Sequence, residues 1–202
     1  MKYVIIILVF LVSCNSNDFF KDKVLTYKVV APYSNHIDTL TMKTIPKLFS
    51  DKLETSFKYY SGNTSTTFSR EGDYTANDKK IKIMSPIGGY LDTTEQLPHP
   101  EINLPPKLND TIFSEHNISS VLPNAGDLIS GYQVVTDYID YSNSGNIFKD
   151  SVWVVELHNK ENNKYKGKYY FSKEFGFVYF QYVFNNLTID IELVSLEKYI
   201  SK

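Results

Sequence analysis

The feature that most constrains the fold is a strict alternation of apolar and polar side chains near the C-terminus. Leu187, Ile189, Ile191 and Leu193 alternate with Thr188, Asp190 and Glu192. Successive side chains of a β-strand point to opposite faces, so a period of two predicts a strand with one buried and one wet face. Strands of this kind are typical of antiparallel sheets that pack one face on a core.

The preceding segments extend this sheet. Residues 165–171 and 177–184 are rich in aromatic and β-branched side chains and flank a glycine-containing turn, which is typical of a β-hairpin. Residues 132–141 and 152–157 have the same character and are bounded by polar loops. The sequence therefore predicts a meander of about five antiparallel strands over residues 131–198.

The N-terminal half shows weaker signals of the same kind. Candidate strands cover residues 24–30, 39–44, 53–60, 66–70 and 80–84. Aromatic residues make up 15% of the chain, and this excess favours sheet over helix. The predicted fold class is mainly β: an antiparallel meander sheet that forms a half-barrel or two packed sheets. One or two short helices are expected, at residues 47–54 and 114–122.

A proline-rich segment separates the two halves. Residues 86–106 hold five of the eight prolines, and proline lacks the N–H that a sheet ladder needs. A linker between two domains is one interpretation. We favour a loop that lies across one sheet, because each half alone would be a marginal domain without disulfides.

The N-terminus has the pattern of a secretory signal. A lysine at position 2 precedes an apolar run over residues 4–12. Nine helical residues span only about 14 Å, roughly half the hydrocarbon core of a bilayer. The run is therefore expected to act as an export signal and not as a stable transmembrane helix.

The end of this run, Leu11-Val12-Ser13-Cys14, resembles the bacterial lipoprotein box, and Cys14 is the only cysteine in the chain. The resemblance implies cleavage before Cys14, a diacylglycerol on its sulfur and acylation of the new amino terminus. Two or more acyl chains anchor a protein stably to a membrane. A plain signal peptide with a coincidental cysteine is the alternative. Asn15, in place of aspartate, implies passage to the outer membrane.

These observations give a predicted domain organisation. Residues 1–13 form the signal peptide, residues 14–23 a lipidated tether, and residues 24–202 a single β-rich domain with the proline-rich loop near 86–106. The expected location is the cell envelope, with the membrane as a partner through the lipid anchor.

No catalytic motif is recognisable in the sequence. The four histidines, at positions 36, 99, 116 and 158, do not share a spacing that would place two on one face for a metal. Neither a catalytic residue, a metal site nor a cofactor is predicted, and a net charge of −2 gives no field for nucleic acid. Asp190 and Glu192 lie about 7 Å apart on one strand face, a spacing available to glycosidase carboxylates. Their alternation with apolar residues favours a solvated strand face instead.

Tyrosine is the most functional-looking bulk feature, with 16 copies. Tyr169, Tyr179 and Tyr182 lie on predicted strands and are candidates to face a ligand, because a tyrosine ring suits sugar stacking or a lipid cavity. Packing of a half-buried sheet is the alternative. Lys164, Lys166 and Lys168 form a basic stripe that could meet anionic lipid or glycan, or could protect an exposed strand edge.

Four Asp-Ser/Thr pairs, three of them followed by an apolar residue, resemble the Asp-Ser/Thr-apolar sites that Bacteroidota O-glycosylate in the envelope. The candidate acceptors are Thr39, Thr93, Thr111 and Ser151. The same pairs also begin strands after polar loops, so that structural interpretation stays open.

Two longer segments resemble small lipid-anchored envelope proteins of Bacteroidota. They are residues 169–180, an aromatic hairpin, and residues 104–111, a proline-rich entry to the second half. This resemblance implies a location and an architecture but no activity. We expect a non-catalytic binding or scaffold module whose partner is an envelope protein, a lipid or a glycan. The alternative is a hydrolase of envelope glycan or peptide, with carboxylates from distant strands.

Overall fold

The computed structural model describes residues 23–32, 37–46, 52–62, 64–118, 125–145 and 148–198. The signal peptide, Cys14 and nearly all of the tether lie outside the described residues, as does His36. No helix in the described part of the chain is both long enough and apolar enough to cross a membrane.

The described chain is built from twelve β-strands and one 3-10 helix. The first half contains β1 (Lys23–Val30), β2 (Asp38–Pro46), β3 (Lys52–Ser61), β4 (Thr64–Ala76), β5 (Lys80–Lys82), the helix η1 (Gly89–Gln96) and β6 (Glu101–Asn103). The second half contains β7 (Thr111–Asn117), β8 (Leu128–Ser142), β9 (Lys149–Asn159), β10 (Tyr165–Ser172), β11 (Gly176–Phe184) and β12 (Leu187–Lys198).

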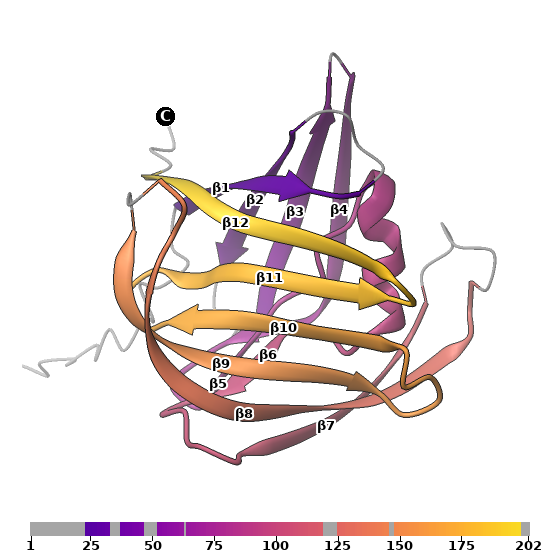
Figure 1. Ribbon diagram of the computed structural model, residues 1–202, viewed down its shortest axis with the longest axis vertical. Coiled ribbons are helices and arrows are strands. Elements are labelled where there is room, and N and C mark those ends of the chain that lie inside the picture. Colours follow the sequence, from indigo (N-terminus) through magenta and orange to yellow (C-terminus); the bar gives the residue numbers. More distant parts are fainter. Residues whose placement is uncertain are drawn as a thin grey trace, which may run out of the picture.

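The strands form one antiparallel sheet in the order β6-β5-β4-β3-β2-β1-β12-β11-β10-β9-β8-β7. Every neighbouring pair is consecutive in the chain except β1 and β12, which join the two halves. Figure 1 shows the sheet strongly curved, with β8–β12 as one wall and β2–β4 crossing behind it. The predicted fold class, mainly β with an antiparallel meander, is confirmed.

Local predictions succeed where the alternation is long. The five strands expected over residues 131–198 are β8 to β12. The helix expected at residues 114–122 is wrong in its described part, because residues 114–117 belong to β7. The helix expected at residues 47–54 is likewise wrong where it is described, because residues 52–54 begin β3. The helix that does form, η1, lies in the proline-rich segment.

The buried face of the sheet, here called the inner face, is largely aromatic. Tyr27, Tyr169, Phe180 and Tyr182 are each 0–1% exposed and belong to one continuous apolar core. The alternation in β11 produces this face directly: alternate residues from Phe180 to Phe184 are buried, and those between them are half-buried. The opposite side of the same strands is here called the outer face.

Residues 83–100, here called the interior segment, fill the hollow of the curved sheet. Ile83, Met84, Leu91 and Leu97 are all 0% exposed. A Cβ on Gly131 in β8 would lie only 2.4 Å from Cγ of Pro98, so the segment packs directly on the sheet backbone. The prolines suit this position, because an irregular segment inside the sheet needs no ladder N–H from them.

Candidate functional site

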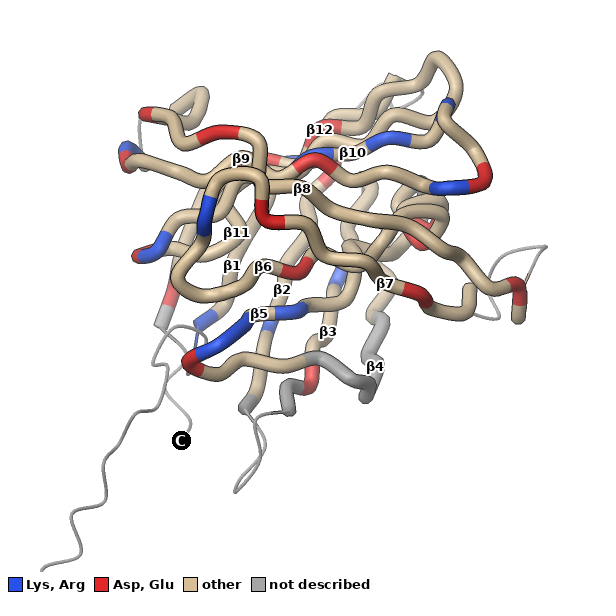
Figure 2. The backbone as a smooth tube through the Cα atoms, turned by 90° about the horizontal axis from the view of Figure 1, so that it is seen from below, with Lys and Arg blue, Asp and Glu red and all other residues tan. Residues whose placement is uncertain are grey.

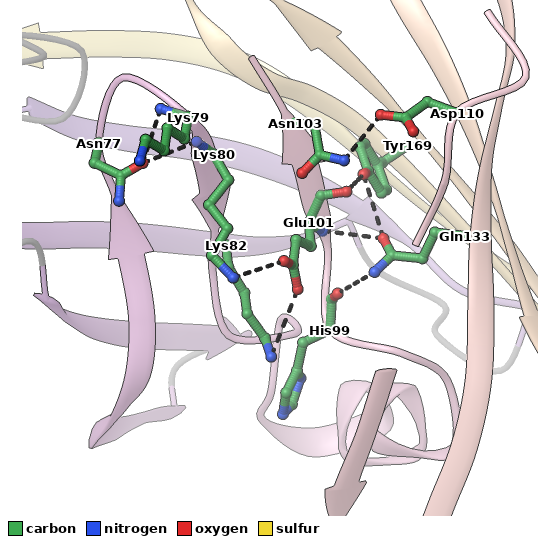
Figure 3. A network of polar contacts seen from close by, with 10 residues as sticks. All are labelled: Asn77, Lys79, Lys80, Lys82, His99, Glu101, Asn103, Asp110, Gln133 and Tyr169. Carbon is green, nitrogen blue, oxygen red and sulfur yellow. Dashed lines mark hydrogen bonds and ion pairs between the residues drawn. The ribbon is translucent and has the colours of Figure 1, made fainter. Parts of the chain in front are cut away.

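A buried polar network lies where the interior segment leaves the hollow and enters β6 (Figure 3). Glu101, the first residue of β6, is 6% exposed, and its carboxylate lies 3.1 Å from Nζ of Lys80 and 3.6 Å from Nζ of Lys82. The pairing of β5 with β6 places both lysines beside it. A buried carboxylate is tolerated when it is paired and hydrogen-bonded, as Glu101 is.

Gln133, on the inner face of β8, fastens this segment to the sheet. Its Oε1 accepts a hydrogen bond from the backbone N–H of Glu101 at 3.0 Å, and its Nε2 donates to the carbonyl of His99 at 2.9 Å. Tyr169 of β10 adds a hydrogen bond from its hydroxyl to the carbonyl of Glu101. Burial raises the pKa of Tyr169 well above its usual value, so the hydroxyl remains a donor. The network satisfies the backbone of an irregular buried segment.

A serine and two histidines lie close together deeper in the same region. The backbone N–H of Ser85 donates to Nδ1 of His99 at 3.2 Å, and the Ser85 Oγ lies 2.9 Å from the same nitrogen. The rings of His99 and His116 lie 4.2 Å apart, and Nε2 of His116 lies 2.8 Å from the carbonyl oxygen of Glu95. A serine beside a histidine is the beginning of a nucleophile–base pair. Ser85, however, is 0% exposed, so no substrate can approach its hydroxyl in this structure.

A pair of carboxylates, Asp190 and Glu192, lies on the outer face. Tyr179 donates a hydrogen bond to Asp190, whose Oδ1 also accepts from Nε2 of Gln181 at 2.8 Å. Glu192 accepts from the hydroxyl of Tyr141 at 3.0 Å and from the backbone N–H of Ser144 at 2.8 Å. Of the two carboxylates suggested by sequence, Asp190 therefore links β12 to β11, and Glu192 holds the turn between β8 and β9 against β12.

The electrostatics of this outer cluster follow from its hydrogen bonds. Partial burial acts to raise the pKa of Glu192, but hydrogen bonds from Ser144 and Tyr141 and the charge of Lys28 outweigh it, so the pKa is lowered. Burial and the neighbouring Glu192 raise the pKa of Tyr141. A general acid needs a carboxyl with a raised pKa, and Glu192 shows the opposite shift.

The predicted ligand-facing tyrosines occupy both faces of the sheet. Tyr169 and Tyr182 are 0% exposed on the inner face, where the interior segment fills the hollow. Tyr179 lies half-buried on the outer face, with its ring 4.8 Å from that of Tyr170. In this structure the two inner rings pack within the core, so a ligand would reach them only after the interior segment had moved. Their ligand-facing role stays a prediction.

Lys166 and Lys168 of the basic stripe lie on the central strand β10, and Lys164 directly precedes it. β10 pairs with β9 on one side and β11 on the other, so the suggestion that its lysines protect a sheet edge is wrong. Lys164 and Lys166 border an open depression of about 480 Å³ with Asn163, Val183 and Asn185. Nζ of Lys168 lies 5.6 Å from the centre of the Tyr170 ring. Contact with anionic lipid or glycan stays a prediction.

The four predicted glycosylation sites differ in accessibility. Thr93 in η1 and Thr111 at the start of β7 are exposed. Thr39 in β2 is half-buried, and so is Ser151 in β9, whose hydroxyl donates to Asp140 at 2.7 Å. An oligosaccharide could be added to the first pair without disturbing the sheet.

Sequence reasoning missed Glu101 and Gln133. One signal was available for Gln133, because it interrupts a buried series in β8 that continues with Ile129, Gly131 and Val135. A polar side chain at an apolar position of the alternation indicates a buried hydrogen-bonding role. Glu101 follows a proline in an irregular segment, and no periodicity marks it. Among the described residues, no group of three or more His, Cys, Asp and Glu side chains is arranged to hold a metal ion.

Comparisons with known proteins return distant structural similarities only. No protein-family model matches the chain, and no curated protein matches it significantly. A beta-barrel-like protein of the domain of unknown function DUF1849 from Brucella abortus is similar over 89% of this chain and 98% of its own, with 10% identity and a TM-score of 0.48. A candidate lipoprotein from Parabacteroides distasonis is similar over 89% of this chain and 96% of its own, with 10% identity and a TM-score of 0.47. The properties of neither protein transfer to this chain at such values.

Proposed function

We propose that this protein is an envelope lipoprotein, anchored through Cys14 to the outer membrane, whose β-sheet body is a non-catalytic binding or scaffold module. Its partner would be an envelope protein, a lipid or a glycan. The anchor rests on the lipoprotein box at residues 11–14.

The observation that supports a non-catalytic body is that the buried polar groups bond to the backbone of the interior segment. Gln133 and His116 bond to the backbone of the interior segment, and Tyr169 bonds to the carbonyl of Glu101 directly after it. Active sites need a cavity in which reacting groups converge and remain free to act. Here the groups at the most promising positions are committed to structure, and no specific observation favours the hydrolase alternative.

Replacement of the lipidated sulfur tests the anchor. Cys14→Ser should abolish incorporation of radiolabelled palmitate and move the protein from the membrane pellet to the soluble fraction, because the acyl chains supply the membrane affinity. Ser16→Ala, two residues further on, is the matched control and should remain membrane-bound. Equal sedimentation of Cys14→Ser and the control would contradict the proposed location.

Native mass spectrometry of protein purified from its own membrane tests the binding role. We expect a lipid, a glycan or a second polypeptide to remain bound to the anchored protein. A preparation that carries only its own acyl chains, and that hydrolyses envelope glycan or peptide, would favour the hydrolase instead.

The glycosylation proposal has a separate test in the intact mass. Sugar increments should be lost from Thr93→Ala and Thr111→Ala, the two exposed acceptors, more readily than from Thr39→Ala or Ser151→Ala. An intact mass that includes acyl chains but no sugar increments would exclude glycosylation and would leave the proposed anchor standing.

A further inference from the structure

The two margins of the sheet are unequally protected. β6 has only three residues, and side chains of Gln133 and Tyr169 bond to its backbone. β7 has seven residues and pairs with β8 on one side. Among the residues that the structure describes, none pairs with its other side, and Figure 2 shows it at the margin beside β8.

The free margin of β7 lacks most of the usual features that prevent strand addition, and Glu115 supplies its one acidic charge. Residues 111–117 contain no lysine, proline or glycine, and their register with β8 runs without a bulge through all seven pairs. Natural proteins usually protect such edges with lysine, proline, a bulge or a covering segment. An unprotected, regular edge is a template for another strand.

The direction of the free hydrogen-bonding groups follows from the end of β7. The N–H of Ile118 donates to the carbonyl of Asp127, and the N–H of Gly126 donates to the carbonyl of Ile118, so the backbone of Ile118 points toward β8. Because backbone groups alternate along a strand, those of Thr111, Phe113, Glu115 and Asn117 point away from β8.

The outer face of this edge is apolar at its centre. The Phe113 side chain is 68% exposed, and its ring lies 6.1 Å from that of Tyr132, which stacks on His158 at 4.7 Å. Nζ of Lys160 lies 5.1 Å from the centre of the Phe113 ring. Glu115 is the only charged residue of β7 apart from any protonated histidine, and it accepts a hydrogen bond from Ser130.

We propose that β7 pairs antiparallel with β7 of a second copy of this chain, with the two-fold axis at Ser114. All seven residues are then paired, and the two sheets become one. Phe113 lies opposite Glu115 of the partner subunit, and both residues direct their backbone groups to the shared edge. An isologous contact of this type closes on itself and yields a dimer.

Charge complementarity favours this register. Lys160, which lies over Phe113, approaches Glu115 of the partner subunit, and symmetry repeats the attraction. An axis at Glu115 would instead place two glutamates opposite each other, which is unfavourable.

An unsatisfied atom supports the same axis. The Oγ of Ser114 is buried and has no hydrogen-bond partner. At the axis, Ser114 and Ser114 of the partner subunit form a non-hydrogen-bonded pair with Cα atoms about 4.5 Å apart. Hydroxyl groups of directly opposed residues can bond to each other, which would satisfy both.

Cysteine cross-linking tests the axis directly. In the full chain carrying Cys14→Ser, Ser114→Cys should form a covalent dimer under mild oxidation, because such a pair lies within disulfide range. Asn186→Cys, an exposed position in the turn between β11 and β12, is the control and should cross-link at least about tenfold more slowly. Equal rates at the two positions, or no cross-link at 114, would overturn the proposal.

Sedimentation velocity of non-cross-linked variants tests the chemistry of the edge. Phe113→Lys should raise the dimer dissociation constant by about tenfold or more, while Leu128→Lys, exposed on β8 of the same hairpin, should leave it unchanged. Glu115→Lys and Lys160→Glu should each weaken the dimer by roughly fivefold, and the double variant should recover. A chain that is monomeric at every concentration, or a charge swap without recovery, would contradict pairing in this register. These tests need no lipid anchor, so their failure leaves the proposed function standing.

Discussion

Tyr182 and Tyr179 lie three residues apart on β11, yet they face opposite environments. Tyr182 is 0% exposed on the inner face, and its hydroxyl has no hydrogen-bond partner. Tyr179 is half-buried on the outer face, and its hydroxyl donates to Asp190. At position 182 the core therefore uses only the tyrosine ring, whereas at position 179 the hydroxyl bonds a neighbouring strand. Changes at Tyr182 should act through volume, and changes at Tyr179 and its neighbours on the outer face through charge and hydrogen bonding.

The largest effect is expected where the interior segment meets the inner face. Leu97→Ala should lower the free energy of unfolding by about 3 kcal/mol, because it removes a fully buried side chain and leaves a cavity. Leu128→Ala, at a position 53% exposed, should change it by less than about 0.5 kcal/mol. Urea unfolding measures both. An equal change in the free energy of unfolding for the two variants would mean that the packing of the interior segment contributes little to stability.

The backbone contact beneath that segment gives the next effect. Gly131→Ala should cost about 2 kcal/mol, since its Cβ would lie 2.5 Å from the carbonyl oxygen of His158 as well as against Pro98. Gly167→Ala should lower the free energy of unfolding by less. A Cβ at position 167 would have Cδ1 of Leu157 as its nearest neighbour, at 3.0 Å, and that side-chain atom can move. Thermal unfolding of both variants would establish the order, and the reverse order would contradict close packing of the segment on β8.

Tyr→Phe changes at two buried tyrosines distinguish the contribution of the ring from that of the hydroxyl. Tyr27 donates a hydrogen bond to the carbonyl of Phe177 at 2.8 Å, so Tyr27→Phe should cost about 1 kcal/mol. Tyr182→Phe should be neutral or slightly stabilising, because the lost hydroxyl has no partner. Chemical denaturation distinguishes them. A large loss of stability for Tyr182→Phe would mean that this hydroxyl has a partner, and would contradict a role of the Tyr182 ring alone.

The smallest effect concerns pH and the outer face. The pKa of Glu192 is lowered in the folded protein, so the ionised form stabilises the fold above the ordinary pKa of 4.5. This contribution should disappear as the pH falls from 4.5 through the folded-state pKa. The stability difference between the natural protein and Glu192→Gln should thus be greatest near neutral pH and should shrink on acidification. A difference independent of pH would show that the charge of Glu192 does not matter.

The sequence predicted the sheet better than the site. Alternation is regular over residues 129–135 in β8, 180–184 in β11 and 189–193 in β12, so these strands could be located from residue type alone. Alternation separates two faces but does not say which one will be covered, and Tyr169 and Tyr179 could not be assigned to opposite faces in advance. The helix η1 was missed because its core contacts come from a curved sheet distant in sequence.

The sequence also did not show which strands lie at the edges of the sheet. Lys164, Lys166 and Lys168 resemble edge protection, but β10 is central because β9 and β11 pair with its two sides. β7 has a weak pattern in which no apolar side chain is fully buried, and it was expected to be partly helical. Local propensity is a poor guide at such positions, since tertiary pairing decides them.

The pairing of β1 with β12 bears on the order of folding. Lys23 pairs with Lys198, so β1 completes its ladder only with the last strand of the described chain. Contacts between residues so remote in sequence form slowly. We therefore expect the hairpins within each half to form first and the seam that unites the halves to close last.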